Sequence, residues 1–314
     1  MTMTQTSDSI LSVTGLTKTF GNFTAVDHIS FDIPKGCLLG FLGENGAGKS
    51  TVINMLTTLI RPTSGEVTIC GNSLGKNDSD IRKKIGIVPQ QNCLDDLLSV
   101  KENLLTRGIL YTSSNREAKE RLAELIPVLK LEDILNRKYK HLSGGQKRRA
   151  EIAAALIHRP EILFLDEPTT GLDPATRLDV WSTIEDLRKD RNMTVFLTTH
   201  YMEEAATADR IIILDHGHVL ADDTPFNLKK HYVKDRLKLY TDDPDRLLNS
   251  DTLKNVPNIT RTGYGLEIAL ANTDIAYLLL SSLKQSGEPL SGFEVILGNM
   301  DDVFLTVTQS TQCL

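Results

Sequence analysis

The sequence of 314 residues has few cysteines and no long apolar run. Its four cysteines (Cys37, Cys70, Cys93 and Cys313) form no CxxC pair, which favours reduced thiols in a cytosolic protein over a metal site or a disulfide framework. No apolar run reaches the roughly 18 to 20 residues that cross a bilayer, so we expect any membrane contact to go through another chain. The polar start MTMTQTSDSI lacks the basic and apolar regions of a secretory signal peptide.

An excess of basic residues is also missing. The chain has 35 Lys and Arg against 41 Asp and Glu, a formal net charge of -6. Because a nucleic-acid-binding protein needs a basic face for the phosphate backbone, this balance argues against nucleic acid as a partner. Hydrophobic residues make up 40% and charged residues 24%, a composition typical of a globular protein with a full core.

Strand and helix patterns alternate along most of the chain. Leu38 to Leu42 is a continuous apolar run of the kind found in buried parallel strands. Comparable strands are expected at 162–165, 194–198 and 211–214, with helical patterns between them. The alternation predicts an α/β fold with a largely parallel sheet. A run of helical patterns interrupts it and predicts an inserted helical subdomain at about 92–147.

The last part of the chain has a different pattern. Strand patterns at 237–240, 265–270 and 293–297 accompany a helical pattern at 274–285. We expect a small α+β domain over 236–314, with a βαββαβ order. The predicted organisation is then a first domain over 10–225, a linker over 226–235, and this second domain.

A phosphate-binding loop follows the apolar run that ends at Leu42. Glycines let a backbone wrap phosphate, consecutive N–H groups at a helix start attract its charge, the lysine adds a point charge, and the serine can ligate Mg²⁺. The sequence therefore predicts an ATP site with a magnesium ion. The residues that match GxxxxGK[ST] and the Thr that follows are Gly43, Glu44, Asn45, Gly46, Ala47, Gly48, Lys49, Ser50 and Thr51.

Two adjacent carboxylates end a second apolar strand. Asp166 and Glu167 follow Ile162 to Leu165. Asp166 is expected to steer Mg²⁺ through a bound water, and Glu167 to polarise the attacking water. A strand that ends in Asp-Glu is a weak signal alone, but in the same chain as a P-loop it becomes strong.

A third motif distinguishes among P-loop proteins. It is Leu142, Ser143, Gly144, Gly145 and Gln146. With it, the chain from about 10 to 225 resembles the ABC ATPase family, which implies a RecA-like core with an amino-terminal antiparallel β-subdomain. Ser143 can cap the helix that starts there, and its glycines allow close approach, which makes a second anion site.

The resemblance implies roles for four further residues. Gln90 matches the Q-loop glutamine, which contacts ATP and its metal ion. Asp173 matches the D-loop aspartate, and His200 matches the switch histidine that acts with Glu167 in catalysis. Phe20 matches the aromatic that stacks on adenine. Phe20 as a core residue, and His200 as a structural histidine, remain the alternatives from the residue types alone.

Partners follow from the same resemblance. It implies a head-to-tail dimer in which each ATP lies between the P-loop of one chain and the signature motif, 142–146, of the other. We favour two copies of this chain over two different cassettes. It also implies a separate integral-membrane permease, with the chain on the inner face of the cell membrane.

Two segments point to a narrower group within the family. Residues 299–308 and 88–111 are similar to those of drug-exporter ATPases of the daunorubicin-resistance type. The resemblance implies export through a short, six-helix type of permease. The alternative is a soluble ABC ATPase that acts on ribosomes or nucleic acid. Lys147-Arg148-Arg149 could serve such binding, although a solvated helix face is the simpler interpretation.

Overall fold

The computed structural model describes residues 9–270, 273–288 and 290–311. It divides into two compact units, and the division falls between Thr224 and Pro225. Unit 1 and unit 2 each have a hydrophobic core of their own. Cys37, Cys70 and Cys93 are free thiols, and burial raises the pKa of each to about 11. Cys313 and residues 1–8 lie outside the described part.

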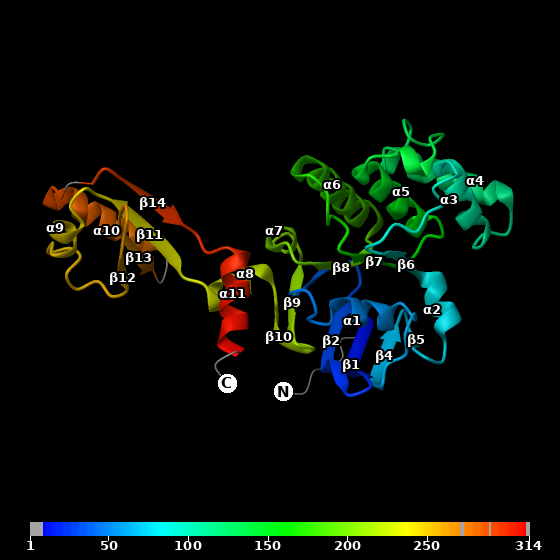
Figure 1. Cartoon of the computed structure of the whole chain (residues 1–314), viewed down its shortest axis with the longest axis horizontal. Helices are drawn as coiled ribbons and strands as arrows, with labels where there is room; N and C mark the ends of the chain where they lie inside the picture. Colours follow the sequence, from blue (N-terminus) through cyan, green and yellow to red (C-terminus); the bar gives the residue numbers. More distant parts are fainter. Residues whose placement is uncertain (1–8, 271–272, 289, 312–314) are drawn as a thin grey trace. The chain divides into compact units, whose positions relative to one another are not determined.

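The central sheet of unit 1 has six strands, and all but the edge strand β10 run parallel (Figure 1). The predicted α/β class is confirmed. Because parallel strands all end at one edge of a sheet, their following loops gather there. In spatial order the strands are β10 (His218–Asp223), β9 (Arg210–Asp215), β3 (Leu38–Leu42), β8 (Thr194–Thr199), β7 (Ile162–Asp166) and β6 (Ile85–Val88).

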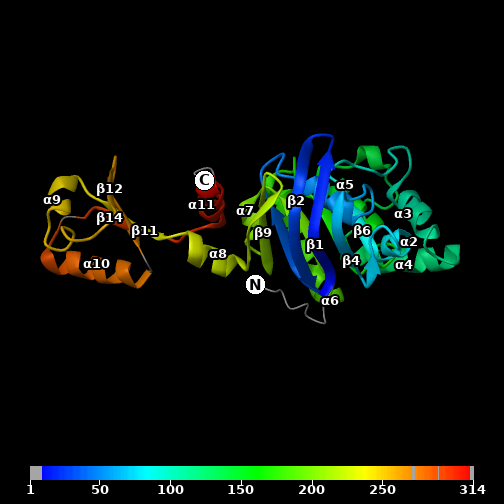
Figure 2. The same ribbon diagram turned by 90° about the horizontal axis from the view of Figure 1, so that it is seen from below.

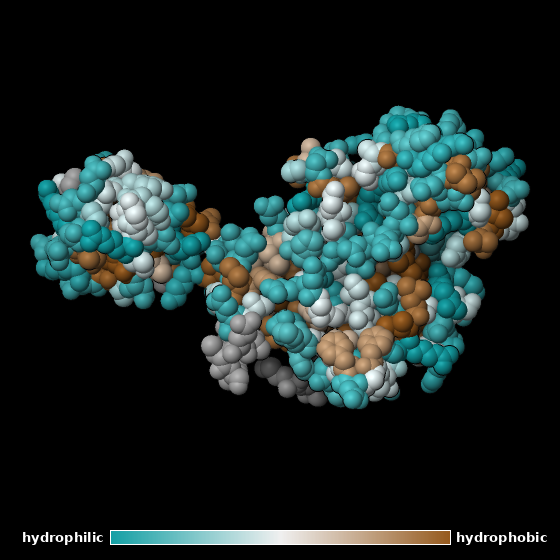
Figure 3. Space-filling view, viewed as in Figure 1, coloured by the Kyte–Doolittle hydropathy of each residue, from teal (hydrophilic) through white to brown (hydrophobic). Residues whose placement is uncertain are grey.

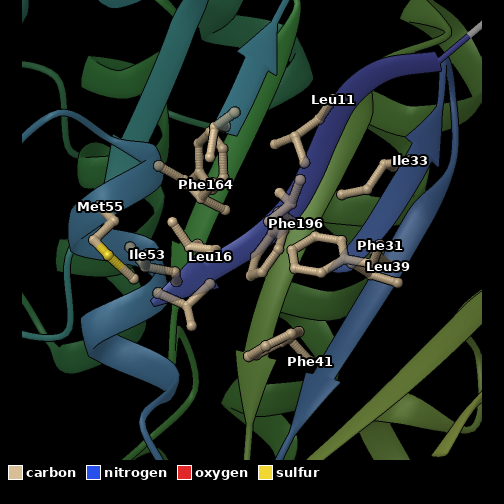
Figure 4. Close-up of a cluster of buried hydrophobic side chains, with 14 of the residues drawn as sticks. Leu11, Leu16, Phe31, Ile33, Leu39, Phe41, Ile53, Met55, Phe164 and Phe196 are labelled. Atoms are coloured by element: carbon tan, nitrogen blue, oxygen red, sulfur yellow. The ribbon is translucent and has the colours of Figure 1, made fainter. Parts of the chain in front are cut away.

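A second, antiparallel sheet packs against the first. Its strands run side by side across unit 1 in Figure 2, and their spatial order is β2 (Phe23–Pro34), β1 (Ser9–Phe20), β4 (Ser64–Ile69) and β5 (Asn72–Ser73). Between the sheets, Phe31, Phe41, Phe164 and Phe196 form a buried cluster with ring centroids 5.1 to 6.3 Å apart (Figure 4). Such tilted aromatic pairs add about 0.5–1.5 kcal/mol each beyond their buried area, so the cluster fixes one sheet on the other.

Helices complete unit 1. Figure 1 shows α3, α4 and α5 grouped on the side of the central sheet away from β1, β2 and β4. Ser99 caps α3 in a capping box with Glu102. The helices and the 3-10 turn are α1 (Lys49–Leu56), α2 (Asp78–Lys84), α3 (Val100–Ile109), α4 (Asn115–Val128), η1 (Tyr139–His141), α5 (Gly144–Leu156), α6 (Pro174–Arg191) and α7 (Met202–Ala205).

Unit 2 contains the βαββαβ order expected from the sequence. The six elements are β11 (Asp235–Tyr240), α9 (Pro244–Leu248), β12 (Ile259–Thr262), β13 (Gly265–Leu270), α10 (Thr273–Ser286) and β14 (Gly292–Ile296). The strands form an antiparallel sheet in the order β12-β13-β11-β14, a split-βαβ arrangement. One face, with Leu237 and Leu239, is buried in the core of unit 2.

Two further helices belong to unit 2. They are α8 (Pro225–Tyr232) and α11 (Met300–Thr311), and they pack against each other. The segment 226–235, expected as a linker, therefore holds most of α8 and the start of β11. The reason is that Leu228 of α8 is buried, so this stretch has an apolar contact that a linker lacks. The tail similarity at 299–308 falls mainly on α11.

Candidate active site

The loop after β3 is shaped by two glycines. Gly48 is the N-cap of α1 and has φ 108°, in the left-handed region that favours glycine. A Cβ at Gly48 would lie 2.6 Å from the Ala25 carbonyl oxygen. Gly46 has φ 90°. The loop can thus turn sharply and present the first N–H groups of α1 to an anion.

Lys49 is held against this loop. Its ammonium donates to the carbonyl oxygens of Gly43 at 2.7 Å and Glu44 at 3.0 Å. The side chain is only 4% exposed, and Nζ lies 3.7 Å from Oε1 of Glu167. Burial lowers the pKa of Lys49, and the Glu167 carboxylate opposes that shift. The ammonium is therefore a fixed point charge beside the expected phosphate position.

Asp166 ends β7 and faces the start of α1. Thr198 of β8 donates to its Oδ1 at 2.6 Å. Burial raises the pKa of Asp166, and hydrogen bonds from Thr198 and Ser50 oppose the shift. Oxygen ligands suit Mg²⁺, which keeps several waters and phosphate oxygens in its shell. Ser50, Asp166 and the Gln90 amide fit that preference. The described residues contain no cluster of three or more His, Cys, Asp or Glu that could hold a metal unaided.

Glu167 is the residue on which the site converges. Its carboxylate accepts from Gln90 Nε2 at 3.1 Å and from the Thr170 hydroxyl at 3.1 Å, both on Oε2. It is 7% exposed, and its backbone has φ 44°. That left-handed conformation is uncommon for a non-glycine residue. The Glu167 N–H donates to the Thr198 carbonyl at 3.1 Å, which fixes the turn.

His200 completes the surroundings of this carboxylate. Its Nδ1 lies 3.4 Å from Oε2 of Glu167, and no hydrogen-bond partner of Nδ1 is found in the part of the chain that the structure describes. The ring leans on Tyr201 with centroids 4.2 Å apart. The Arg177 guanidinium covers the Tyr201 ring at 3.8 Å. The Tyr201 ring and the Arg177 guanidinium stacked on it therefore orient the His200 imidazole.

Lys49, Ser50, Gln90 and Glu167 line one cleft of about 480 Å³, which also includes Phe20 of β1, whereas Asp166 and His200 are not among its described lining residues. Lys18 Nζ lies 4.9 Å above the Phe20 ring. Phe23 is 65% exposed and lines the same cleft. The sequence interpretation missed Phe23, although its signal was present. Phe20-Gly21-Asn22-Phe23 reads as a two-residue hairpin turn, which places the two rings opposite each other.

The signature motif lies elsewhere in the chain. Residues 142–146 are absent from the described lining of the cleft. As expected, Ser143 caps α5, in a capping box with Gln146. Packing within the chain also requires glycine at position 145, because a Cβ on Gly145 would lie 2.2 Å from Cγ2 of Thr176. Thr176 in turn bonds Asp173, the N-cap of α6.

The basic run 147–149 differs from both interpretations offered by the sequence. Arg148 is 6% exposed and donates to backbone carbonyls inside unit 1. Arg149 donates to the Lys130 carbonyl at 2.7 Å. The run is therefore neither a free basic patch nor a wholly solvated face, because its middle residue points into the protein.

Comparisons with known proteins agree with the geometry. The family model described as ABC transporter matches residues 26–170. The chain is 36% identical over 308 residues to the daunorubicin/doxorubicin resistance ATP-binding protein DrrA of Streptomyces peucetius, covering 95% of this chain and 92% of that protein. It is 39% identical over 241 residues to the Nod factor export ATP-binding protein I of Rhizobium sp. (strain N33), covering 76% and 79%.

A solved structure matches unit 1 in shape. The dimeric ATP-binding cassette MJ0796, in a post-hydrolysis state bound to ADP and Pi, is 32% identical with a TM-score of 0.62. The match covers 68% of this chain and 98% of that one. In the part of the chain that the structure describes, no helix is both long and apolar enough to span a membrane.

Proposed function

The chain belongs to the ABC transporter family of ATP-binding proteins and is an ATPase, and from this premise we propose that it drives export through a separate membrane permease. The observation that carries the hydrolytic part of the proposal is the Glu167 carboxylate, which has Lys49, Gln90 and His200 around it beside the P-loop. Both named relatives are described as resistance or export ATP-binding proteins. Their descriptions favour export over a soluble ATPase that acts on ribosomes or nucleic acid.

In the proposed reaction, water attacks the γ-phosphorus of ATP and the bond to the β–γ bridging oxygen breaks, which yields ADP and phosphate. Glu167 accepts the proton of the attacking water. Lys49 and His200 stabilise the charge on the γ-phosphate oxygens, and the N–H groups at the start of α1 hold the phosphates. Phe20 stacks on the adenine, and the structure adds Phe23 as a second candidate.

The residues that would hold Mg²⁺ are Ser50, Gln90 and, through a water, Asp166. When bound, the ion neutralises charge on the β- and γ-phosphate oxygens. Thr198 fixes the Asp166 carboxylate for this contact through the 2.6 Å hydrogen bond. Gln90 would hold the ion through its amide oxygen, while its amide nitrogen donates to the Glu167 carboxylate.

The signature motif supports a composite site. Ser143 and the capped start of α5 offer a second anion-binding point, away from the cleft of their own chain. We place them on the ATP of a second cassette arranged head to tail, and we favour two copies of this chain. The D-loop Asp173 caps α6 beside the signature glycines, so it lies at the same proposed interface. The solved relative is described as dimeric.

A groove between the helical part and the core of unit 1 is the proposed permease contact. Its volume is about 380 Å³, and its lining includes Leu59, Ile87, Leu110, Tyr111 and His158. Leu110 is 77% exposed. Figure 3 shows apolar side chains gathered on this face between polar surroundings. An apolar groove fits a short helix of a membrane protein, and the chain would then lie on the cytoplasmic face of the cell membrane.

Co-purification tests this assignment. The tagged chain, expressed with a candidate permease, should follow the membrane fraction and retain the permease after detergent extraction. Leu110→Asp should abolish retention, because it places a charge in the apolar groove. Leu278→Asp is the matched control, since Leu278 is 63% exposed but lies in unit 2. Equal retention by both variants would remove the groove from the proposal, and recovery of ribosomes instead would favour the alternative function.

A further inference from the structure

Helix α5 carries two buried charges beyond its signature motif. Arg148 is 6% exposed and Glu151 is 1% exposed. They are three residues apart, so they lie on one side of the helix. The nucleotide cleft uses neither. A charge removed from water needs specific partners, and each of the two residues has partners in one segment, 89–94, which contains Gln90.

Arg148 holds the start of this segment. Its guanidinium donates to the Pro89 carbonyl at 2.8 Å and to the Gln90 carbonyl at 3.5 Å. It also donates to the Glu167 carbonyl at 3.4 Å. One planar cation therefore joins the backbones of the two residues whose side chains meet at 3.1 Å in the cleft.

Glu151 holds the end of the segment. Its Oε1 accepts from the N–H groups of Cys93 at 2.8 Å and Leu94 at 3.2 Å. Its Oε2 accepts from the Cys93 thiol at 2.9 Å. Burial and the hydrogen bond to Glu151 raise the pKa of Cys93 to about 11, so the thiol is protonated at neutral pH and can donate.

The contacts of Arg148 and of Glu151 with segment 89–94, here called the two clasps, connect that segment rigidly to α5. The Arg148 guanidinium donates to the carbonyls at the start of segment 89–94. The Glu151 carboxylate accepts from the N–H groups at its end. The amino end of the same helix is the Ser143 cap, about 12 Å from Glu151 at the usual rise per residue. Asn103 of α3 also fixes the residue that follows this segment, because its side-chain oxygen accepts from the Asp95 N–H at 2.8 Å.

We propose that Arg148 and Glu151 are positioning residues that fasten segment 89–94 to the signature helix, so that Gln90 and Ser143 move together. This inference rests on the proposed composite site. Gln90 senses the ATP of its own chain, whereas Ser143 contacts the ATP of the partner. The connection through α5 thus makes closure of one site depend on occupancy of the other, within a single rigid element.

A matched control lies on the same carboxylate. The Tyr139 hydroxyl donates to Oε1 of Glu151 at 2.8 Å, and Tyr139 is buried. Tyr139→Phe removes one hydrogen bond to Glu151 but leaves the holds on Cys93 and Leu94. Glu151→Gln keeps the side-chain volume while it puts an amide where several donors converge. Arg148→Met removes the other clasp, and Arg148→Lys restores the charge with one donor group.

The test compares nucleotide binding with dimerisation. In a Glu167→Gln background with Mg-ATP, Glu151→Gln and Arg148→Met should weaken dimerisation by at least about 10-fold. The affinity of the dilute monomer for a fluorescent ATP analogue should stay within about 2-fold. Tyr139→Phe should change neither quantity by more than about 2-fold, and Arg148→Lys should recover part of the dimerisation lost in Arg148→Met. With native Glu167, kcat should fall while KM for ATP holds.

Three results would overturn the inference. The first is dimerisation equal to that of Tyr139→Phe in both clasp variants. The second is nucleotide affinity that falls in step with dimerisation. The third is thermal unfolding that explains all losses, with no recovery in Arg148→Lys. A parent chain that neither binds ATP nor dimerises with it would contradict the proposed function instead, before any clasp variant is considered. If Glu151→Gln fails to fold, the Arg148 pair decides the matter alone.

Discussion

Lys49 in unit 1 and Lys238 in unit 2 each have a glutamate about 4 Å away, but their surroundings differ. Lys49 is buried, bonds two backbone carbonyls, and faces Glu167 across the cleft. Lys238 lies 4.0 Å from Glu294 and 5.4 Å from the centre of the Tyr264 ring on the sheet of unit 2. The Lys49 ammonium is held at the phosphate-binding loop, whereas the Lys238 ammonium is paired with a carboxylate on the protein surface.

The same contrast extends over the whole sheet face of unit 2. Arg236 lies 3.6 Å from Glu267 and 3.4 Å from Asp302. The Tyr240 and Tyr264 hydroxyls donate to Glu294 at 3.1 Å and to Glu267 at 2.9 Å. These charges are paired among themselves, which is typical of a structural surface. In unit 1 the charges converge on one cleft, which is typical of a ligand site.

The largest expected effect separates two glutamates. Glu167→Gln should lower kcat for ATP hydrolysis by about 10² to 10⁴-fold while ATP still binds, because the amide cannot accept the proton of water. Glu294→Gln should leave kcat unchanged. Steady-state phosphate release, with nucleotide binding measured separately, checks both. Normal turnover by Glu167→Gln would remove it as the base.

The next effect separates the two lysines. Lys49→Ala should weaken ATP binding by about 10- to 100-fold, the size of a lost hydrogen bond to a charged group. Lys238→Ala should leave it unchanged. Titration with a fluorescent nucleotide reports both affinities, and a thermal melt separates loss of binding from loss of folding. Equal losses in the two variants would contradict the contrast between the units.

A smaller effect is expected when unit 2 is removed. Residues 1–224 contain every residue of the cleft and the core of unit 1. The truncated chain should fold and bind ATP within about 3-fold of the full chain. Calorimetric titration and circular dichroism measure the two properties. A truncated chain that folds but cannot bind ATP would show that unit 2 contributes to the site.

The smallest effect concerns the surface pairs themselves. Arg236→Ala removes half-exposed ion pairs to Glu267 and Asp302. Such pairs are usually worth no more than about 1 kcal/mol, so the melting temperature should fall by a few degrees at most. ATP hydrolysis should not change. A lost ATPase activity with an intact melt would reveal a function in this face that the pairing does not suggest.

Local patterns predicted much of this architecture. The apolar run 38–42, followed by glycines and Lys49, identified β3, its loop and α1, because each element has a short-range signature. The strand signals in the tail predicted the βαββαβ order of unit 2. The clear signals were the strands at 237–240, 265–270 and 293–297 and the helix at 274–285, whereas β12 and α9, which are only 4 and 5 residues long, had no signal of comparable strength.

What the sequence could not give depends on distant contacts. Glu151 bonds Cys93, which is 58 residues away in sequence, and nothing near either residue signals the pair. Arg148 looked exposed because its neighbours are basic, yet its guanidinium reaches the carbonyls of Pro89 and Glu167. Gly145 matches an anion-binding motif by its sequence, and only the folded structure brings Thr176 against it.

The central claim is that each ATP is bound by two chains. Lys49→Ala damages the P-loop, and Ser143→Arg places bulk and charge in the signature motif. Each homodimer then has two damaged sites, whereas the mixed dimer has one intact site. Phosphate release should reappear on mixing, at up to about half the normal rate if the sites act independently.

Cross-linking reports the same geometry without turnover. Single cysteines placed in the P-loop of one chain and in the signature motif of another, in a background that lacks the native thiols, should cross-link between chains when Mg-ATP is present. The account predicts both the recovered hydrolysis and these cross-links. Cross-links found only within single chains, with no activity recovered on mixing, would contradict it.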